Sequence, residues 1–197
     1  KRDYNKAKKY YEISSNLKNP KAFLKLGDFY AKGISNDTNY FMAKYYYELS
    51  AKQNNSKALF SLGVIYANGL GVEQNYKIAK KYYELAAEQN NSEAILDLGI
   101  MCANGLGVDK DYVKAKEYYE KSAKLNNSNA LLAIGHLYAF GMGVKQDHKK
   151  AKEYYELSAK KIIQMHFLIW EIYILLEWAL NKIMFKQEYI MNYLQNK

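Results

Sequence analysis

Residues 58–93 read ALFSLGVIYANGLGVEQNYKIAKKYYELAAEQNNSE, and residues 94–129 follow the same pattern as AILDLGIMCANGLGVDKDYVKAKEYYEKSAKLNNSN. The two stretches place alanines, glycines and a pair of tyrosines at matching positions, 36 residues apart. Self-similarity at a fixed period of this length is typical of repeat proteins, in which each unit packs on its neighbours. The sequence therefore predicts an array of helical repeats.

The same register extends over most of the chain. The alanine that opens each unit recurs at the same spacing, as Ala22, Ala58, Ala94 and Ala130. Near the start, Ala7-Lys8-Lys9-Tyr10-Tyr11 matches the second half of a unit. We expect a half unit, four units and a separate tail, over residues 1–21, 22–57, 58–93, 94–129, 130–161 and 162–197.

The first half of each unit has the pattern of an amphipathic helix. Leu59, Leu62 and Ile65 recur at helical spacing, and Gly69 follows where a helix can end in the left-handed conformation. Small residues such as Gly63 are expected to let the two helices of a unit approach closely, while the paired tyrosines fill the space between units.

The second half begins with a residue that can cap a helix. This residue is Asn75 in the unit quoted first, and its equivalents are Asn39, Asp111 and Asp147. The triplet Asn90-Asn91-Ser92 links one unit to the next, and it suggests a left-handed asparagine turn followed by a serine cap. Because one helical pair cannot bury its own apolar face, we expect an all-α fold: an α/α superhelical solenoid with a concave surface.

Composition excludes several classes of site. The 197 residues contain one cysteine, Cys102, so that neither an internal disulfide nor a thiolate zinc site can form. The few histidines lack carboxylate or cysteine partners at ligand spacing, and Gly69-Leu70-Gly71-Val72 lacks the lysine of a phosphate loop. We expect no cofactor, no metal and no catalytic residue. The sequence does not identify the cellular compartment, although the cytoplasm is favoured.

The net charge of +9 comes almost entirely from lysine, since Arg2 is the only arginine. Arginine is the preferred reader of phosphates and base edges, so no nucleic-acid partner is expected. The chain begins without methionine, and we expect the true N-terminus to be missing.

The recurring pattern A-x-x-x-L-G-x-x-Y-x-x-G-x-G-V, followed by A-x-x-Y-[YW]-x-x-[AS]-A, resembles the Sel-1-like repeat family, relatives of the tetratricopeptide repeat. The resemblance covers roughly residues 1–161. It implies a bacterial scaffold or adaptor that binds a protein or peptide on the first helices of its units and performs no catalysis.

Two alternatives remain open. Some cysteine-rich members of this family are linked to β-lactam binding or hydrolysis, but they carry a cysteine pair in each repeat. Cys102 instead stands where Tyr30, Tyr66 and Tyr138 stand, which predicts a core substitution. The second alternative is nucleic-acid binding through the lysine-rich surface, which would weaken steeply with salt.

Positions that vary while the repeat pattern stays fixed are candidates for partner contacts. Three such columns lie on the first helices, and they begin at Lys25, Asp28 and Lys32. They also include nonpolar members such as Val64, Ile100 and Phe140. The predicted partner-binding residues, on the expected concave face, are Lys25, Asp28, Lys32, Ser61, Asn68, Asp97, Asn104 and His136.

From Ile162 the pattern gives way to an apolar tail. A membrane helix is a poor interpretation, because Glu171, Glu177 and Lys182 interrupt it. Back-translation in an alternate frame turns the first tail residues into Asn-Asn-Ser-Asn-Ala, the text of residues 126–130. We therefore expect residues 162–197 to be a frameshifted fifth repeat, which resequencing of the gene would test.

Overall fold

A computed structural model describes residues 4–33, 38–164 and 168 of the chain. The structure is all-α over this part, as the repeat pattern predicts, and no strand occurs among these residues. A further helical stretch covers residues 148–164. The labelled helices are α1 (Tyr4–Asn16), α2 (Pro20–Lys32), α3 (Tyr40–Ala51), α4 (Ser56–Asn68), α5 (Tyr76–Ala87), α6 (Ser92–Asn104), α7 (Tyr112–Lys124) and α8 (Ser128–Phe140).

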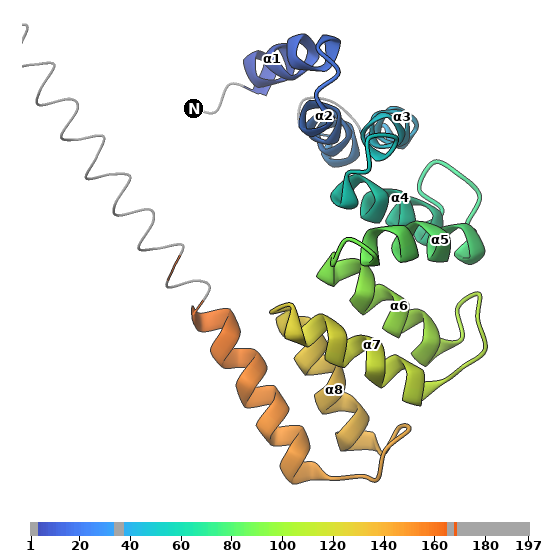
Figure 1. Cartoon of the computed structure of the whole chain (residues 1–197), viewed down its shortest axis with the longest axis vertical. Helices are drawn as coiled ribbons and strands as arrows, with labels where there is room; N and C mark the ends of the chain where they lie inside the picture. Colours follow the sequence, from blue (N-terminus) through green and yellow to red (C-terminus); the bar gives the residue numbers. More distant parts are fainter. Residues whose placement is uncertain (1–3, 34–37, 165–167, 169–197) are drawn as a thin grey trace, which may run out of the picture.

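The helices pack as successive antiparallel pairs along an arc (Figure 1). The most extensive contacts join α2 to α3, α4 to α5 and α6 to α7, and each pair then packs on the next. The helical stretch 148–164, drawn in orange, follows α8 in the same way. This arrangement confirms the predicted α/α solenoid.

Asparagine and aspartate side chains cap both helices of each unit. Asn75 Oδ1 accepts a hydrogen bond from Ile78 N at 3.0 Å, and Asp111 Oδ1 accepts one from Lys114 N at 2.9 Å, as predicted for the second helices. The predicted serine caps of the first helices are wrong. In α6 the cap is Asn91, which accepts from Ala94 N at 2.9 Å, while Ser92 is already the first helical residue.

The turns between units have the predicted left-handed residue. Asn54, Asn90 and Asn126 have φ values of 60°, 58° and 67°. Lys18 occupies the same place in the opening half unit, with a φ of 56°. Asparagine tolerates this region better than other residues with a side chain, which explains its recurrence there.

The core forms around the glycine of each first helix. A methyl group on Gly99 would lie 2.5 Å from Cε1 of Tyr119, so only glycine admits this ring. The same contact joins Gly63 to Tyr83, and the tyrosine is buried in both units. Of the paired tyrosines expected to fill the space between units, only the second is buried in these two units. The first member, such as Tyr82, is half-buried and stacks on Tyr66 at the surface.

Residues 165–167 and 169–197, which hold most of the expected frameshifted repeat, lie outside the described part of the chain. Residues 162–164 simply continue the last helix. Among the described helices, none has both the length and the apolar character needed to cross a membrane.

Candidate functional site

A hollow of about 690 Å³ extends across three successive first helices. Its walls come from α2, α4 and the start of α6, together with the turn between α3 and α4. The members that bear on binding are Lys21, Lys25, Asp28, Lys57, Phe60, Ser61 and Glu93. The hollow therefore joins three repeats in one surface.

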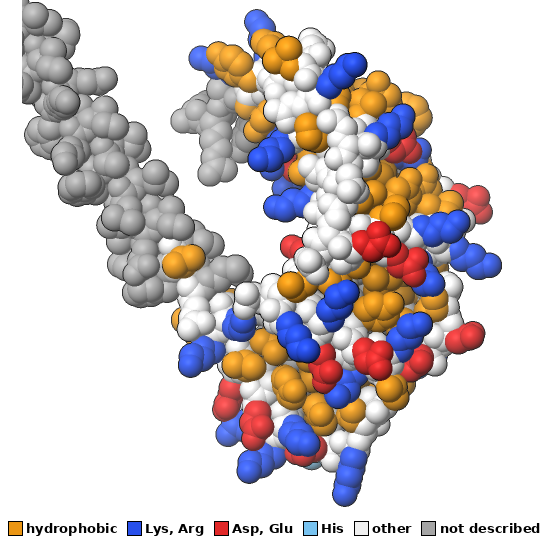
Figure 2. All heavy atoms as spheres, viewed as in Figure 1, with side chains coloured by type: hydrophobic (Ala, Val, Ile, Leu, Met, Phe, Trp, Pro, Cys, Tyr) orange, Lys and Arg blue, Asp and Glu red, His pale blue; other side chains and the backbone are white. Residues whose placement is uncertain are grey.

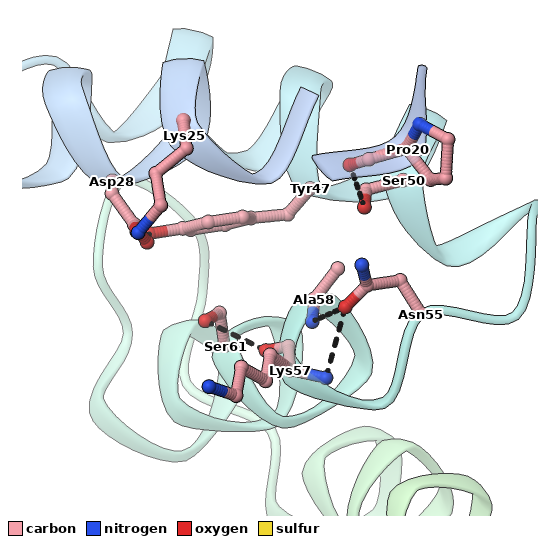
Figure 3. A network of polar contacts seen from close by, with 9 residues as sticks. All are labelled: Pro20, Lys25, Asp28, Tyr47, Ser50, Asn55, Lys57, Ala58 and Ser61. Carbon is pink, nitrogen blue, oxygen red and sulfur yellow. Dashed lines mark hydrogen bonds and ion pairs between the residues drawn. The ribbon is translucent and has the colours of Figure 1, made fainter. Parts of the chain in front are cut away.

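A polar network fixes one wall of this hollow (Figure 3). Lys25 Nζ lies 3.4 Å from Oδ2 of Asp28, and the Tyr47 hydroxyl donates to Oδ1 of Asp28 at 3.1 Å. Burial, followed by the nearby charge of Asp28, raises the pKa of Tyr47, so the hydroxyl remains a donor. Asp28 is thus held by partners from α2 and α3.

The opposite wall carries hydrogen-bonding and apolar groups. Ser61 Oγ donates to the carbonyl of Lys57 at 3.0 Å, and its oxygen can still accept. Phe60 is half-buried beside it, and Leu24 is buried on the facing helix. Apolar groups near placed polar groups are typical of binding sites.

The turns between repeats form a polar edge of the hollow. Gln89 Nε2 donates to Oδ1 of Asn54 at 2.8 Å, which links two successive turns 35 residues apart. An equivalent bond joins Lys161 to Asn126 farther along the array. These bonds hold neighbouring turns in a fixed relation.

A second, smaller hollow of about 180 Å³ lies between α4, α5 and α6 and is lined by Asn68, Tyr83 and Asp97, among others. Burial raises the pKa of Asp97 to about 6, the charge of Glu93 adds to this, and a hydrogen bond with the Tyr83 hydroxyl partly opposes it. Asp97 is therefore a carboxylate whose charge is costly at neutral pH.

The structure brings together only some of the predicted residues. The large hollow contains Lys25, Asp28 and Ser61, and the small hollow contains Asn68 and Asp97. Three predicted residues lie outside both hollows and are exposed: Lys32, Asn104 and His136. His136 packs instead against Tyr155 with ring centroids 5.5 Å apart, and against Phe140 at 6.4 Å.

Several lining residues belong to a fourth column of the repeat, which was not among the predicted partner-binding columns. Lys21, Lys57 and Glu93 lie one helical turn before Lys25, Ser61 and Asp97, on the same helix face. The sequence signal that could have identified them is their spacing of four residues from the predicted positions, which puts both on one helix face. This column reads Lys21, Lys57, Glu93 and Asn129, so it alters the charge of the surface from one repeat to the next.

Groups of three or more histidine, cysteine, aspartate or glutamate side chains placed to hold a metal ion do not occur within the described ranges. Cys102 is buried, which confirms its prediction as a core substitution, and burial raises the pKa of its thiol. A thiol with a raised pKa is a weak nucleophile at neutral pH.

Comparison with known proteins identifies the repeat. A family model for the Sel1 repeat matches residues 1–19, 20–55, 56–91, 92–127 and 128–161. The last four ranges begin at the first residues of α2, α4, α6 and α8. No curated protein matches the chain significantly.

Solved structures agree with the family match. The chain is 30% identical to a Sel1 repeat protein from Oxalobacter formigenes, with a TM-score of 0.74 over 80% of this chain and 64% of that one. It is 29% identical to a protective antigen with an SLR fold from uropathogenic Escherichia coli, with a TM-score of 0.69 over 81% of this chain and 34% of that one. The chain thus spans less than two thirds of the length of either relative.

A third similar structure is cysteine-rich protein B from Helicobacter pylori. It is 28% identical, with a TM-score of 0.50 over 64% of this chain and 90% of that chain.

Proposed function

The chain belongs to the Sel1 repeat family, whose members generally mediate protein interactions, and we propose that it is a non-catalytic scaffold that holds a partner protein on its first helices. The hollow across α2, α4 and α6 carries this proposal, because a surface continuous over three repeats suits an extended polypeptide better than a compact substrate.

The chemistry of the hollow favours a partner segment that combines carboxylates with an apolar side chain. Lys21, Lys25 and Lys57 place three positive charges around the hollow against the two negative charges of Asp28 and Glu93. Asp28 is already engaged by Lys25 and Tyr47. Phe60 offers an apolar contact between them. Complementary charges would steer such a segment to the hollow and fix its register.

The predicted partner-binding residues differ in their expected contact with the partner. Lys25, Asp28 and Ser61 contact the partner in the large hollow, and Asn68 and Asp97 extend the contact along the small one. The exposed residues Lys32, Asn104 and His136 lie outside both hollows and have no assigned contact.

The two alternatives have weaker support. The Helicobacter protein is cysteine-rich by name, whereas this chain has one buried cysteine, so the resemblance gives no support for an enzyme of that class. For nucleic acid, the lysines would need to form a continuous basic path. On the visible face of α5 to α8, lysine and acidic side chains are instead interspersed (Figure 2).

Affinity capture with two matched triple variants tests the proposal. The first variant carries Lys21→Glu, Lys25→Glu and Lys57→Glu in the hollow. The control carries Lys77→Glu, Lys81→Glu and Lys145→Glu, which are exposed residues outside it. Both variants change the net charge equally, so that a general loss of positive charge affects them alike.

We expect wild type and control to retain the same protein and the hollow variant to lose it, with at least tenfold weaker binding when the partner is purified and titrated. Equal loss in both variants, or retention of salt-sensitive nucleic acid alone, would contradict the proposal.

A further inference from the structure

A stacked pair of tyrosines recurs in three of the units. Tyr30 stacks on Tyr46 with ring centroids 5.6 Å apart, and Tyr66 stacks on Tyr82 at 5.7 Å. A third pair, Tyr138 and Tyr154, also lies at 5.7 Å, with an interplanar angle of 9°. The first member of each pair comes from the first helix of a unit, and the second member comes from the second helix.

Lysines complete the surroundings of the first ring in these units. Lys8 Nζ, from the preceding helix, lies 4.9 Å from the ring centroid of Tyr30, and Lys44 Nζ lies 6.0 Å from that of Tyr66. Lys150 approaches Tyr138 from the following helix at 5.3 Å. An ammonium group within about 6 Å of an aromatic ring attracts it electrostatically. Each ring is therefore held between a tyrosine and at least one lysine.

The third unit keeps these surroundings but lacks the ring. Cys102 occupies the ring position, and a cavity of about 390 Å³ opens beside it. The cavity is lined by Tyr118, Lys80 and Lys114, which correspond to Tyr82, Lys44 and Lys150 in the other units. Leu98 and Met101 form its apolar floor.

The size and access of the cavity suit a small molecule. Pockets for such ligands typically measure about 300–1,000 Å³. Lys114 and Asp111 are exposed at its edge, so solvent reaches the cavity, while Leu98 and Met101 are buried. The thiol matters for the cavity only because it is smaller than a tyrosine ring.

We propose that this cavity binds a small phenolic molecule, whose ring stacks on Tyr118 and lies beside Lys80 and Lys114. The internal tyrosines show which group fits these surroundings, since Tyr66 occupies the equivalent space one repeat earlier. The site lies between α5, α6 and α7 and is separate from the hollow proposed for a partner protein.

Titration with p-cresol, which is the side chain of tyrosine as a free molecule, tests this site by NMR. We expect shift changes centred on Met101, Cys102 and Tyr118, with a dissociation constant of about 1 mM or lower. Cys102→Tyr should weaken binding at least tenfold, because its own ring fills the cavity. Cys102→Ser keeps the space and should bind as wild type does.

Two further probes define the occupant. 4-Methylcyclohexanol has a similar size but no aromatic face, and it should bind at least fivefold more weakly than p-cresol. Unchanged p-cresol binding by Cys102→Tyr, or shift changes remote from Tyr118 in the wild type, would overturn the proposal. Binding of a tyrosine-containing peptide without binding of p-cresol would overturn the assignment to a small molecule. The NMR shift changes of the wild-type protein locate the binding site even where a variant fails to fold.

Discussion

The second and third repeats, α4 with α5 and α6 with α7, share one framework and differ in what fills it. Both place a buried tyrosine against a glycine, and both use a side-chain cap at each helix start. Among the positions at which they differ, three matter most: Tyr66 becomes Cys102, Ser61 becomes Asp97, and Ala86 becomes Ser122. The glycine and cap positions fix the fold, whereas single substitutions give one repeat a cavity and a carboxylate with a raised pKa.

Replacing the shared glycine should have the largest effect, and an equal one in both repeats. Gly63→Ala and Gly99→Ala should each lower the free energy of unfolding by about 3 kcal/mol, because the added methyl group collides with a buried tyrosine ring. Urea unfolding followed by circular dichroism measures this loss. Asn68→Ala, at an exposed site on α4, is the control, and a loss below about 0.5 kcal/mol in either glycine variant would refute a shared framework.

Asp97 should give the third repeat a pH dependence that Ser61 cannot give the second. The folded pKa of about 6 lies above the value of about 3.9 in an unfolded chain. Between these values the folded state binds more protons, so stability falls as pH rises from about 4 to 6. Asp97→Asn should therefore raise the free energy of unfolding at pH 7 by about 2 kcal/mol.

Urea unfolding at pH 4, 5.5 and 7 checks this prediction. Asp109→Asn removes the same charge from an exposed site and should leave the pH dependence unchanged. The same slope with pH in wild type and Asp97→Asn would show that Asp97 is ionised without cost.

Converting the third repeat to the pattern of the second should stabilise it modestly. Cys102→Tyr restores a ring that can stack on Tyr118, and we expect a gain of about 1 kcal/mol in the free energy of unfolding. Thermal and urea unfolding measure this gain, with Cys102→Ser as the control for loss of the thiol. Destabilisation by the tyrosine would mean that the surroundings of Cys102 no longer accept a ring.

The smallest effect is expected where the second repeat lacks a hydroxyl. Ser122 Oγ donates to the carbonyl of Ser92 at 2.7 Å, and Ser50 makes the same bond to Pro20. Ala86→Ser should form the equivalent bond and add about 0.5 kcal/mol, whereas Ser122→Ala should lose about 1 kcal/mol. Opposite signs in matched urea experiments support the comparison, and a loss in both variants would contradict it.

The fold could be predicted because the same structural signals recur in each repeat. Three signals agree across the units: a glycine after each first helix, a capping residue before each second helix and an alanine at each close contact. Each helix assignment is therefore supported by its equivalents in the other units. The prediction of serine caps was wrong for a local reason. Asn91 precedes Ser92 in extended conformation with its side chain on Ala94 N, which leaves the serine as the first helical residue.

The candidate sites were less predictable because they depend on space between units. The columns of Lys25, Asp28 and Lys32 are visible in the sequence, but only the packing of α2 on α4 shows that Lys57 and Phe60 face the same hollow. Likewise the change from tyrosine to cysteine at residue 102 is plain in the sequence. Whether neighbouring side chains close the gap can be decided only in three dimensions.

The pattern of helix contacts also determines how the molecule responds to mechanical force. Contacts run mainly between consecutive helices, with a minor one between α4 and α6, so no strong tie joins distant parts of the described array. When the chain is pulled from its ends, we therefore expect the repeats to unfold one at a time at similar forces. Each step would release 36 residues, which corresponds to about 120 Å of extended chain.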